Sequence, residues 1–405
     1  MPIAQSSQVC VVGGGPAGMM LGFLLARSGI SVRVLEKHAD FFRDFRGDTI
    51  HPSTLEILDE LGILDDFLKL PHQEVRQLRG QIGDSTLTLA DFTHMPVRCK
   101  FLAFMPQWDF LNFLAGKARV YPTFKLEMES EATGLCFDGD RVTGVRVKKS
   151  AGEQDVFASL VVGADGRRSI IREAAGLQPE DFGAPMDVLW MRISRQSTDP
   201  GQVLGRVDYG RIFVMLDRGD YWQCGLVVPK GALDEIKQRG LPALRDEIKR
   251  IAPFLGDRVD EIKSWDDIKL LTVQVDRLRK WYRQGLLCIG DAAHAMSPVG
   301  GVGINLAIQD AVAAANILIP ALRETGTASE AVLEKIQKRR ELPTRIIQDG
   351  QIAIQNNIIR RVLGTEGRMS PPLIIRLIGA VPLLRRIPAR LVGLGFRREH
   401  VRVDR

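Results

Sequence analysis

A glycine-rich turn near the N-terminus has the spacing with which a peptide backbone can bind a phosphate group. Gly13, Gly15 and Gly18 follow a short apolar run at residues 8–12 and precede a longer one at residues 19–27. The first glycine permits a tight turn, the second lets a pyrophosphate approach the backbone, and the third lets a helix pack closely on a strand. The amide groups and dipole of that helix then favour the phosphate charge. The sequence therefore predicts a dinucleotide-binding turn.

Four more residues of this first unit are candidate cofactor contacts. Pro16 and Ala17 lie inside the turn, where the helix is expected to begin. Glu36 ends a second apolar run at residues 31–35, where a carboxylate can accept hydrogen bonds from ribose hydroxyls and disfavours a 2′-phosphate. Lys37 follows it directly. The alternative, a glycine-rich turn that binds nothing, is the weaker interpretation because the turn lies between a strand and a helix.

A second cluster of small residues lies far along the chain and contains one acid. Asp291 follows the apolar run 286–290, where a carboxylate at a strand end can reach a ribityl hydroxyl. The glycines after it let main-chain amides face a flat ligand at a helix start and stabilise negative charge on a reduced flavin. The candidate contacts in this cluster are Pro298, Gly301, Gly303, Ile304 and Asn305.

This cluster, through to Asp310, resembles the Gly-Asp motif of the flavin-dependent aromatic hydroxylases, the single-component monooxygenases similar to para-hydroxybenzoate hydroxylase. A third element, residues 162–169 with Asp165 near its centre, looks like the Asp-Gly motif of the same family. The resemblance places that motif between FAD and the path of the nicotinamide cofactor. Taken alone, the element is a strand-end turn and a helix cap.

Two further cofactor contacts rest on the resemblance only. Arg46 matches an arginine that reaches the FAD phosphate or the flavin, with Arg43 as a competing choice, and Gln107 matches a glutamine at a helix start. A solvated arginine is the alternative for either Arg46 or Arg43. The resemblance covers about residues 8–180 and 270–345.

The family resemblance implies a FAD-dependent monooxygenase. NADH or NADPH would reduce FAD, O₂ would add at the flavin C4a, and the hydroperoxide would hydroxylate a phenolic or polyketide-like aromatic substrate. No second glycine motif is visible, so the nicotinamide is expected to dock transiently. The catalytic residues stay unassigned, because the cofactor performs the difficult chemistry.

Three other functions were weighed against this one. A hydroxylase of a prenylated quinone precursor at a membrane surface stays within the family. A FAD-binding sensor without turnover belongs to another class and would have the same flavin site. A flavin halogenase is disfavoured, because the segment at Trp222 lacks paired tryptophans.

The histidines and cysteines suggest no metal site. His294 lies inside the Gly-Asp motif and is interpreted as structural, while His51 is worth testing because it lies near Arg46 in the sequence. The five cysteines are widely spaced, which is typical of packed thiols in a reduced compartment. With no cationic leader before the first apolar run, we expect a cytoplasmic protein.

These patterns predict an α/β fold. A Rossmann-like FAD-binding domain is expected to be interleaved with a largely antiparallel β-sheet substrate domain and followed by a C-terminal helical region. The expected parts are 1–180 for the first FAD-binding segment, with a small antiparallel sheet, 181–275 for the substrate sheet, 276–345 for the second FAD-binding segment and 346–405 for a helical, basic tail.

The helices and strands expected within these parts follow from hydrophobic periodicity. Helices are expected at 53–70, 108–118, 303–320 and 328–361, with one in the substrate sheet near 241–252. Extended segments are expected at 98–106, 188–193, 211–216, 221–228 and 286–290.

The positive charge of the chain is confined to its C-terminal end. The formal net charge of the 405 residues is +6, and residues 371–405 contain eight arginines and two acids, so the body is neutral. Nothing therefore supports nucleic-acid binding.

The apolar stretch inside this tail has two interpretations. Residues 373–396 either form a cationic surface helix for an anionic membrane or, as the favoured interpretation, pack their leucines on the body. Arginines and prolines interrupt the stretch too often for a membrane span. The oligomeric state is left open.

Overall fold

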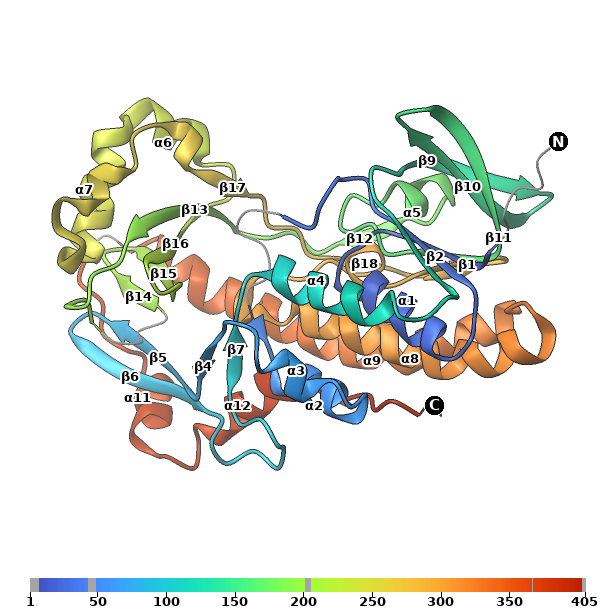
Figure 1. Ribbon diagram of the computed structural model, residues 1–405. Coiled ribbons are helices and arrows are strands. Elements are labelled where there is room, and N and C mark those ends of the chain that lie inside the picture. The colour runs from blue at the N-terminus through green and yellow to red at the C-terminus, as the bar shows by residue number, and fades with distance from the viewer. Residues whose placement is uncertain (1–6, 43–48, 201–204, 366, 403–405) are drawn as a thin grey trace.

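The protein has two large β-sheets joined by a layer of long helices (Figure 1). The structure is a computed structural model that describes residues 7–42, 49–200, 205–365 and 367–402. Its α/β architecture, with a mostly parallel sheet, a second sheet and a helical C-terminal region, confirms the predicted fold class.

The first sheet has a parallel centre with the strand order β20, β11, β1, β2, β8. The antiparallel β19 pairs with β20 at one edge. The sequence favours these strands because Val, Leu and Cys runs suit a sheet that is buried on both faces. Their bounds are β1 (Ser7–Val12), β2 (Val32–Leu35), β8 (Phe124–Glu127), β11 (Gly152–Gly163), β19 (Tyr282–Arg283) and β20 (Leu286–Cys288).

Four helices pack against one another beside this sheet (Figure 1). α1 (Pro16–Arg27) lies against both α4 (Gln107–Ala118) and α8 (Gly303–Thr325), and α8 lies against α9 (Glu330–Ile354). α8 is long and apolar enough to cross a membrane, but 83% of its most apolar stretch is buried in the protein. It is therefore a core helix.

The small antiparallel sheet expected between 120 and 165 is present. β9 (Glu131–Asp138) and β10 (Arg141–Lys149) pair with each other, and β10 pairs with the outer half of β11. β11 then continues into the parallel sheet, so one long strand joins the two.

The second sheet has seven strands in the order β17, β13, β16, β15, β14, β5, β6. The three strands expected at 188–193, 211–216 and 221–228 are confirmed as β13, β15 and β16. The bounds of the seven are β5 (Gln77–Ile82), β6 (Ser85–Asp91), β13 (Met186–Ser194), β14 (Gly205–Asp208), β15 (Arg211–Asp217), β16 (Tyr221–Pro229) and β17 (Lys269–Leu271).

Two features of this region were not expected from the sequence. β5 pairs in parallel with β14, so residues 77–91 belong to a sheet that was expected to lie wholly within 181–275. The helix expected near 241–252 is confirmed as α7 (Leu241–Ile251), but a further helix that was not expected, α6 (Leu233–Arg239), precedes it across Gly240. α7 buries Leu244, Ile248 and Ile251 against the sheet core, the helical spacing that the prediction used.

The remaining elements connect these layers. The helix expected at 53–70 is two helices, because the chain turns at Gly62. The helices expected at about 328–361 are present as α9 and the short α10 (Arg360–Leu363), joined by a π turn at Gln355–Ile359. The other bounds are α2 (Pro52–Glu60), α3 (Leu64–Phe67), α5 (Ile170–Ala174), β3 (Thr49–Ile50), β4 (Gln73–Val75), β7 (Leu102–Phe104), β12 (Pro179–Asp181) and β18 (Asp276–Leu278). Short 3₁₀ turns lie at Pro253–Glu261, Trp265–Asp267, Gly290–Ala292 and Val299–Gly301.

The C-terminal tail forms α11 (Leu373–Ala380) and α12 (Arg386–Gly393), both packed on β6. The favoured interpretation, in which the leucines of this tail pack on the body, is wrong for most of them. Leu373 is 83% exposed and Leu383 is 63% exposed, whereas Leu394 is buried. The body instead contacts the small residues of the tail, which leaves the large apolar side chains outside.

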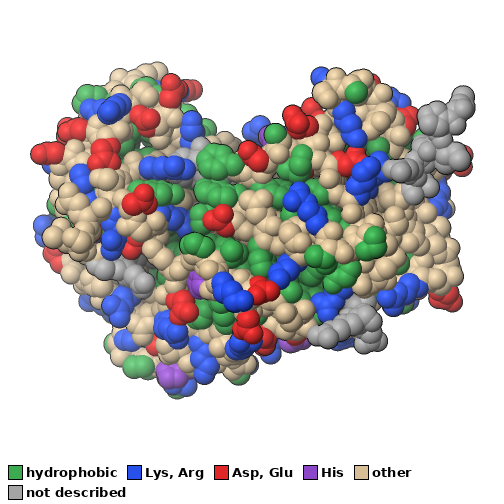
Figure 2. Space-filling model, viewed as in Figure 1, with side chains coloured by type: hydrophobic (Ala, Val, Ile, Leu, Met, Phe, Trp, Pro, Cys, Tyr) green, Lys and Arg blue, Asp and Glu red, His purple; other side chains and the backbone are tan. Residues whose placement is uncertain are grey.

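The face of the molecule in Figure 2 is hollowed between the end with α6 and α7 and the end with β9 and β10. Hydrophobic side chains gather below the hollow, and positive and negative side chains are interspersed around it. This face carries no large field of one sign, which agrees with the neutral composition of the body.

Candidate functional site

The three sequence motifs meet at one edge of the parallel sheet. Val12 lies beside Leu35 in β2 and beside Gly163 in β11, and Gly163 lies beside Cys288 in β20. The residues that follow these strand ends are the glycine turn, Glu36, the Asp165 element and Asp291. Ligands of open parallel sheets bind beyond the carboxyl ends of the strands, so this edge is the candidate site.

Gly13 brings the glycine turn against the Asp165 element. Its φ is +105°, and a Cβ atom there would lie 2.3 Å from the carbonyl oxygen of Ala164 and 2.9 Å from the Cα of Asp165. A Cβ atom at Gly18 would lie 2.0 Å from the carbonyl oxygen of Gly13. Glycine is required at both positions, so these two residues serve the close packing of the turn.

Gly290 brings the Gly-Asp motif against the same turn. A Cβ atom there would lie 3.2 Å from the Cβ of Ala17 and 3.4 Å from the Cβ of Ala307. The strand end before Asp291 is thereby held between α1 and α8. Ala17 acts in this contact as a small packing residue.

The start of α1 fits a pyrophosphate. Gly15 precedes the helix, no side chain caps the first amides, and the first turn contains no acid. A Cβ atom at Gly15 would meet nothing within 4 Å, so the space beside Gly15 itself is open. Pro16 begins the helix and lacks an amide hydrogen in any case.

Glu36 is held beside this turn by two backbone amides. Its carboxylate accepts hydrogen bonds from the amide of Gly14 at 3.0 Å and from the amide of His38 at 3.1 Å. Glu36 is buried, and a carboxylate has lone pairs for further donors such as ribose hydroxyls. Lys37 is exposed next to it.

The loop before α8 is fixed by residues 49–54. Thr49 donates from Oγ1 to the carbonyl of Gly301 at 3.0 Å. Asn305 accepts at Oδ1 from the His51 amide at 2.9 Å and from Thr54 Oγ1 at 2.7 Å. Asn305 therefore positions this loop through its side chain.

The start of α8 offers main-chain amides in the same way as α1. No side chain caps it, its first turn contains no acid, and Gly303 is its first residue. Ile304 is 7% exposed and packs in the core, so a contact from Ile304 to a ligand would use its backbone. The half-buried Pro298 accepts a hydrogen bond from the Gly301 amide at 3.0 Å, which closes the turn before the helix.

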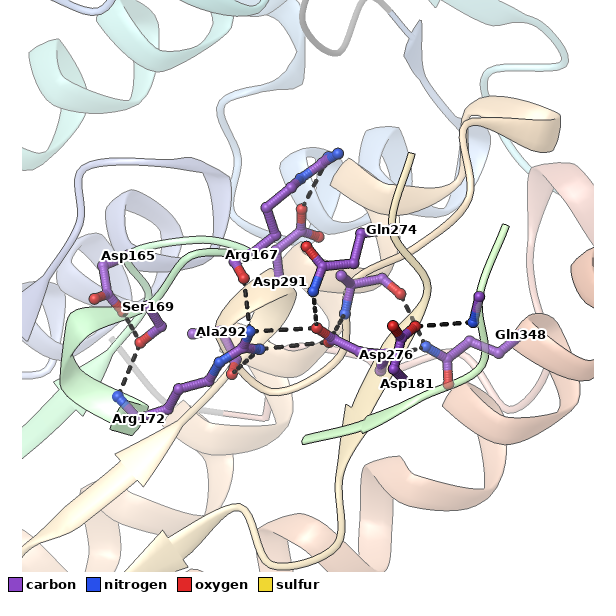
Figure 3. Close-up of polar contacts among 12 residues, drawn as sticks. Asp165, Arg167, Ser169, Arg172, Asp181, Gln274, Asp276, Asp291, Ala292 and Gln348 are labelled. Atoms are coloured by element: carbon purple, nitrogen blue, oxygen red, sulfur yellow. Dashed lines mark hydrogen bonds and ion pairs between the residues drawn. The ribbon is translucent and has the colours of Figure 1, made fainter. Parts of the chain in front are cut away.

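Asp291 lies beside Arg167 (Figure 3). The distance from Arg167 Nη2 to Asp291 Oδ2 is 3.4 Å, and both side chains are about 30% exposed. Arg167 also donates to the Thr272 carbonyl at 3.3 Å. Asp291 is thus a carboxylate at a strand end, partly open to solvent and within reach of a ligand in front of the sheet.

Asp165 lies in a strand-end turn and supports the cap of α5, the local role that the sequence of this element suggests without the family resemblance. It accepts from Ser169 Oγ at 2.5 Å and from the Ile171 amide at 3.2 Å, and Ser169 caps α5. Burial raises the pKa of Asp165, and these hydrogen bonds offset only part of that effect. The carboxylate stabilises the helix start, and its role towards a cofactor stays a prediction.

A buried network behind the loop that follows Asp291 was missed in the sequence (Figure 3). Arg172 binds Asp276 at 3.2 Å, and Asp276 accepts from the Ala295 amide at 3.1 Å. Gln348 donates to the carbonyls of both Asp276 and Ala295. No motif marks Asp276 or Gln348, and only the fold brings them to Arg172.

A second buried network lies behind Gly290. Asp310 accepts from the Gly290 amide at 3.1 Å, lies 2.6 Å from His294 Nε2 and accepts from Arg340 Nε at 2.9 Å. Arg340 Nη1 also lies 3.4 Å from Glu399 in the tail. The structural interpretation of His294 agrees with this arrangement.

The remaining predicted residues contribute little to the description of this site. Arg46 and its competitor Arg43 lie outside the described residues. Gln107 is half-buried at the first position of α4. Within the described ranges, no group of three or more His, Cys, Asp and Glu side chains is arranged to hold a metal ion.

His51 is fully buried and lies next to the start of α8, where its amide binds Asn305. This position, and not its nearness to Arg46 in the sequence, makes His51 of interest. Its Nδ1 lies 2.7 Å from the Val392 carbonyl, so Nδ1 carries the hydrogen and Nε2 is the bare nitrogen of the neutral ring. Nε2 is buried and has no hydrogen-bond partner of good geometry in the described chain. Burial lowers the pKa of His51 to about 4, although the carbonyls of Val392 and Gly301 oppose that effect.

We expect His51 to make the stability of the protein depend on pH. Its pKa is lower in the folded state than the unfolded value of 6.5, so stability is full above 6.5 and falls as the pH approaches about 4. The loss attributable to His51 is roughly 3 kcal/mol. Urea denaturation of the wild type and of His51→Gln, near pH 7 and near the lower value, measures it. The glutamine variant should lose less stability on acidification, and equal losses would contradict the assignment.

Comparisons with known proteins agree with this geometry. The sequence profile described as FAD binding domain matches residues 6–349. The chain is 32% identical over 403 residues to 6-methylpretetramide 4-monooxygenase of Streptomyces rimosus, covering 98% of this chain and 94% of that protein. It is 27% identical to aklavinone 12-hydroxylase DnrF of Streptomyces peucetius, covering 96% of this chain and 80% of that one.

A solved structure supports the fold. The crystal structure of p-nitrophenol 4-monooxygenase PnpA from Pseudomonas putida DLL-E4 superimposes with a TM-score of 0.79, covering 97% of this chain and 99% of the other. The two sequences are 21% identical, so this likeness concerns the fold alone.

Proposed function

Because the chain belongs to the FAD binding domain family of flavin-dependent aromatic hydroxylases, we propose that it hydroxylates a polyketide-like aromatic compound. It is a FAD-dependent monooxygenase, with O₂ and NAD(P)H as the co-substrates typical of that family. The substrate class is suggested by relatives named for acting on 6-methylpretetramide and aklavinone.

The meeting of three motifs at one sheet edge is the observation that supports this proposal most. Gly13 contacts the Asp165 element, Gly290 contacts Ala17, and the starts of α1 and α8 are both without a side-chain cap. Two sets of free amides suit a ligand with a pyrophosphate at one end and a flavin that gains negative charge at the other.

We infer specific roles for the residues around this ligand. The amides after Gly15 would bind the pyrophosphate, Glu36 the ribose, and Asp291 a ribityl hydroxyl, while the amides of Gly303 and Ile304 at the start of α8 would face the flavin. FAD, when bound, supplies the oxygen-activating chemistry. The chain would orient the aromatic ring and exclude water around it.

We further infer that the seven-stranded sheet positions the substrate. This proposal keeps the division at 1–180, 181–275, 276–345 and 346–405, but adds residues 77–91 to the sheet unit because β5 and β6 pair there. Sheet residues such as Met186, Val188 and Trp190 form an apolar cluster with Val299 of the turn before α8. An apolar aromatic substrate would suit these surroundings.

A cytoplasmic location is part of the same proposal. Cys10, Cys99, Cys224 and Cys288 are buried free thiols and Cys136 is half-buried, as expected for a reduced compartment. Burial raises the pKa of Cys10 to about 12, so this thiol stays protonated and unreactive.

Flavin reduction and oxygen uptake test the proposed activity. The FAD-loaded protein is mixed with NADH or NADPH, with and without members of a panel of fused-ring phenols, simple phenols and prenylated quinone precursors. We expect flavin bleaching and oxygen uptake to increase with fused-ring phenols, together with a product one oxygen atom heavier. Turnover of prenylated quinone precursors alone would favour the membrane-surface alternative, and a flavin that no combination reduces would favour a sensor.

A further inference from the structure

The two tail helices expose an apolar surface that the fold does not explain. On α11, Leu373, Ile374 and Leu377 are 83%, 65% and 51% exposed, and on α12, Ile387 and Leu391 are 58% and 55% exposed. We define the tail surface as these five side chains together with Leu383 and Val381 of the connecting turn. Monomeric proteins rarely expose so many large aliphatic side chains together, and such patches usually mark an interaction site.

Both helices pack on the body through their small residues and not through their leucines. A Cβ atom at Gly379 would lie 2.7 Å from Leu87, and one at Gly393 would lie 2.8 Å from Met95. Ala389 is fully buried. Small residues therefore face the body and large ones face outwards, so the outward leucines contribute little to the stability of the fold.

Both helices lie at the same edge of the molecule. Each packs on β6, which is the edge strand of the seven-stranded sheet (Figure 1). The Asp91 amide of β6 donates to the Arg385 carbonyl at 3.2 Å, which holds the turn between the helices. The exposed side chains of α11 and α12 thus flank a single sheet edge.

The charges within the segment that carries the tail surface are positive only. Residues 367–398 contain seven arginines and no acid. Arg376, Arg386, Arg390 and Arg397 are exposed, and no ion-pair partner is found for them in the described part of the chain. Glu399, the next acid, faces inwards to Arg339 and Arg340.

We propose that the tail surface docks onto the surface of an anionic lipid bilayer. Its Leu and Ile side chains would enter the headgroup region, and its four exposed arginines would bind lipid phosphates. Each helix has eight residues and is roughly 12 Å long, which is too short to cross a bilayer. A symmetric contact with a second copy is disfavoured, because it would bring the arginines of both copies together. This proposal goes beyond the proposed function and does not depend on it.

Vesicle sedimentation of the FAD-loaded full chain tests the proposal. Vesicles of phosphatidylcholine are compared with vesicles that also contain phosphatidylglycerol, at low and high salt. We expect binding to the anionic vesicles that weakens with salt. The triple variant Arg376→Gln, Arg386→Gln, Arg390→Gln should lower the partition coefficient by roughly a hundredfold, at about fivefold for each arginine.

An apolar variant and a matched control separate insertion from simple charge attraction. Leu377→Asp with Ile387→Asp should lower anionic vesicle binding at least about tenfold. Leu342→Asp, at a 49% exposed site on α9, should bind as the wild type does. Thermal unfolding verifies that all variants are folded.

Three outcomes would overturn the proposal. In the first, the wild type stays in the supernatant with both vesicle types. In the second, the tail variants bind as well as the wild type does. Alternatively, size-exclusion chromatography with light scattering would find a dimer that the Leu377→Asp, Ile387→Asp variant converts to a monomer, without vesicle binding by either. That last result would assign the tail surface to self-association.

Discussion

Asp291→Ala is expected to give a folded protein that purifies with little or no FAD. The carboxylate lies after β20, at the edge where the three motifs meet, and its side chain is 30% exposed. A hydrogen bond from a ribityl hydroxyl to a carboxylate contributes about 1.5–3 kcal/mol, so its loss should weaken FAD binding roughly 10- to 100-fold. The FAD to protein absorbance ratio and a titration of the apoprotein with FAD measure this effect.

The fold should tolerate this change, which makes the result interpretable. The ion pair of Asp291 with Arg167 is long and partly exposed, so its loss should cost less than about 1 kcal/mol. Asp257→Ala is a matched control, because Asp257 is 92% exposed and pairs with Lys249 on the surface. Asp291→Ala that keeps full FAD absorbance would exclude Asp291 as a cofactor contact, whereas loss of FAD from both variants would show a general instability.

The parts of the site that lie close together in the sequence were predictable. The glycine turn with its strand and helix, Glu36 at the end of β2 and Asp291 at the end of β20 follow from local periodicity and from residue chemistry. Their meeting also follows, since parallel strands place their carboxyl ends at one edge. The position of α4, with Gln107 at its first residue, was correct for the same local reason.

The residues that support the site from behind were not predictable from local patterns. Asp276 meets Arg172 across 104 residues of sequence, and Glu399 meets Arg340 across 59. A single charged residue in an otherwise ordinary strand or helix is usually solvated, so the sequence contains no signal that these are buried. The pairing of β5 with β14 is similar, because strand neighbours depend on the whole topology.

The tail shows a different limit of sequence reasoning. The tail was expected to be helical, and α11 and α12 lie there. Periodicity identifies an apolar face but not the neighbour that covers it. Gly379, Ala389 and Gly393 were the available signal, since a line of small residues allows a close approach of the backbone to another element.

Arg340→Met is expected to destabilise the protein by about 3–5 kcal/mol, because it leaves a buried carboxylate without its partner. Arg340 is 1% exposed and Asp310 is fully buried. Burial alone would raise the pKa of Asp310, but His294 and Arg340 together lower it below the usual 3.8. Chemical denaturation of the wild type and the variant measures the change in the free energy of unfolding.

The pH dependence of this effect has a defined sign. A carboxyl group with a lowered folded-state pKa stabilises the fold above its unfolded value, and this stability is lost as the pH falls through the lowered value. Without Arg340, the pKa of Asp310 should rise towards or above its unfolded value, so the variant should lose less stability on acidification than the wild type does, and its deficit should be smaller at low pH than near neutrality. Its FAD should also be held less tightly, since Asp310 accepts the hydrogen bond of the Gly290 amide next to Asp291.

Two comparisons distinguish this network from a general effect of charge removal on α9. Lys338→Met removes a 69% exposed lysine that pairs with Glu334 one turn away, and should cost less than about 1 kcal/mol. Arg340→Lys keeps the charge, but one ammonium cannot donate to Asp310 and Glu399 in the arrangement that the guanidinium fork reaches. If Arg340→Met were no more destabilising than Lys338→Met, Asp310 would be adequately paired by His294 alone. An intermediate loss in Arg340→Lys would instead show that the geometry of the fork, in addition to its charge, connects the tail to the loop that carries Asp291.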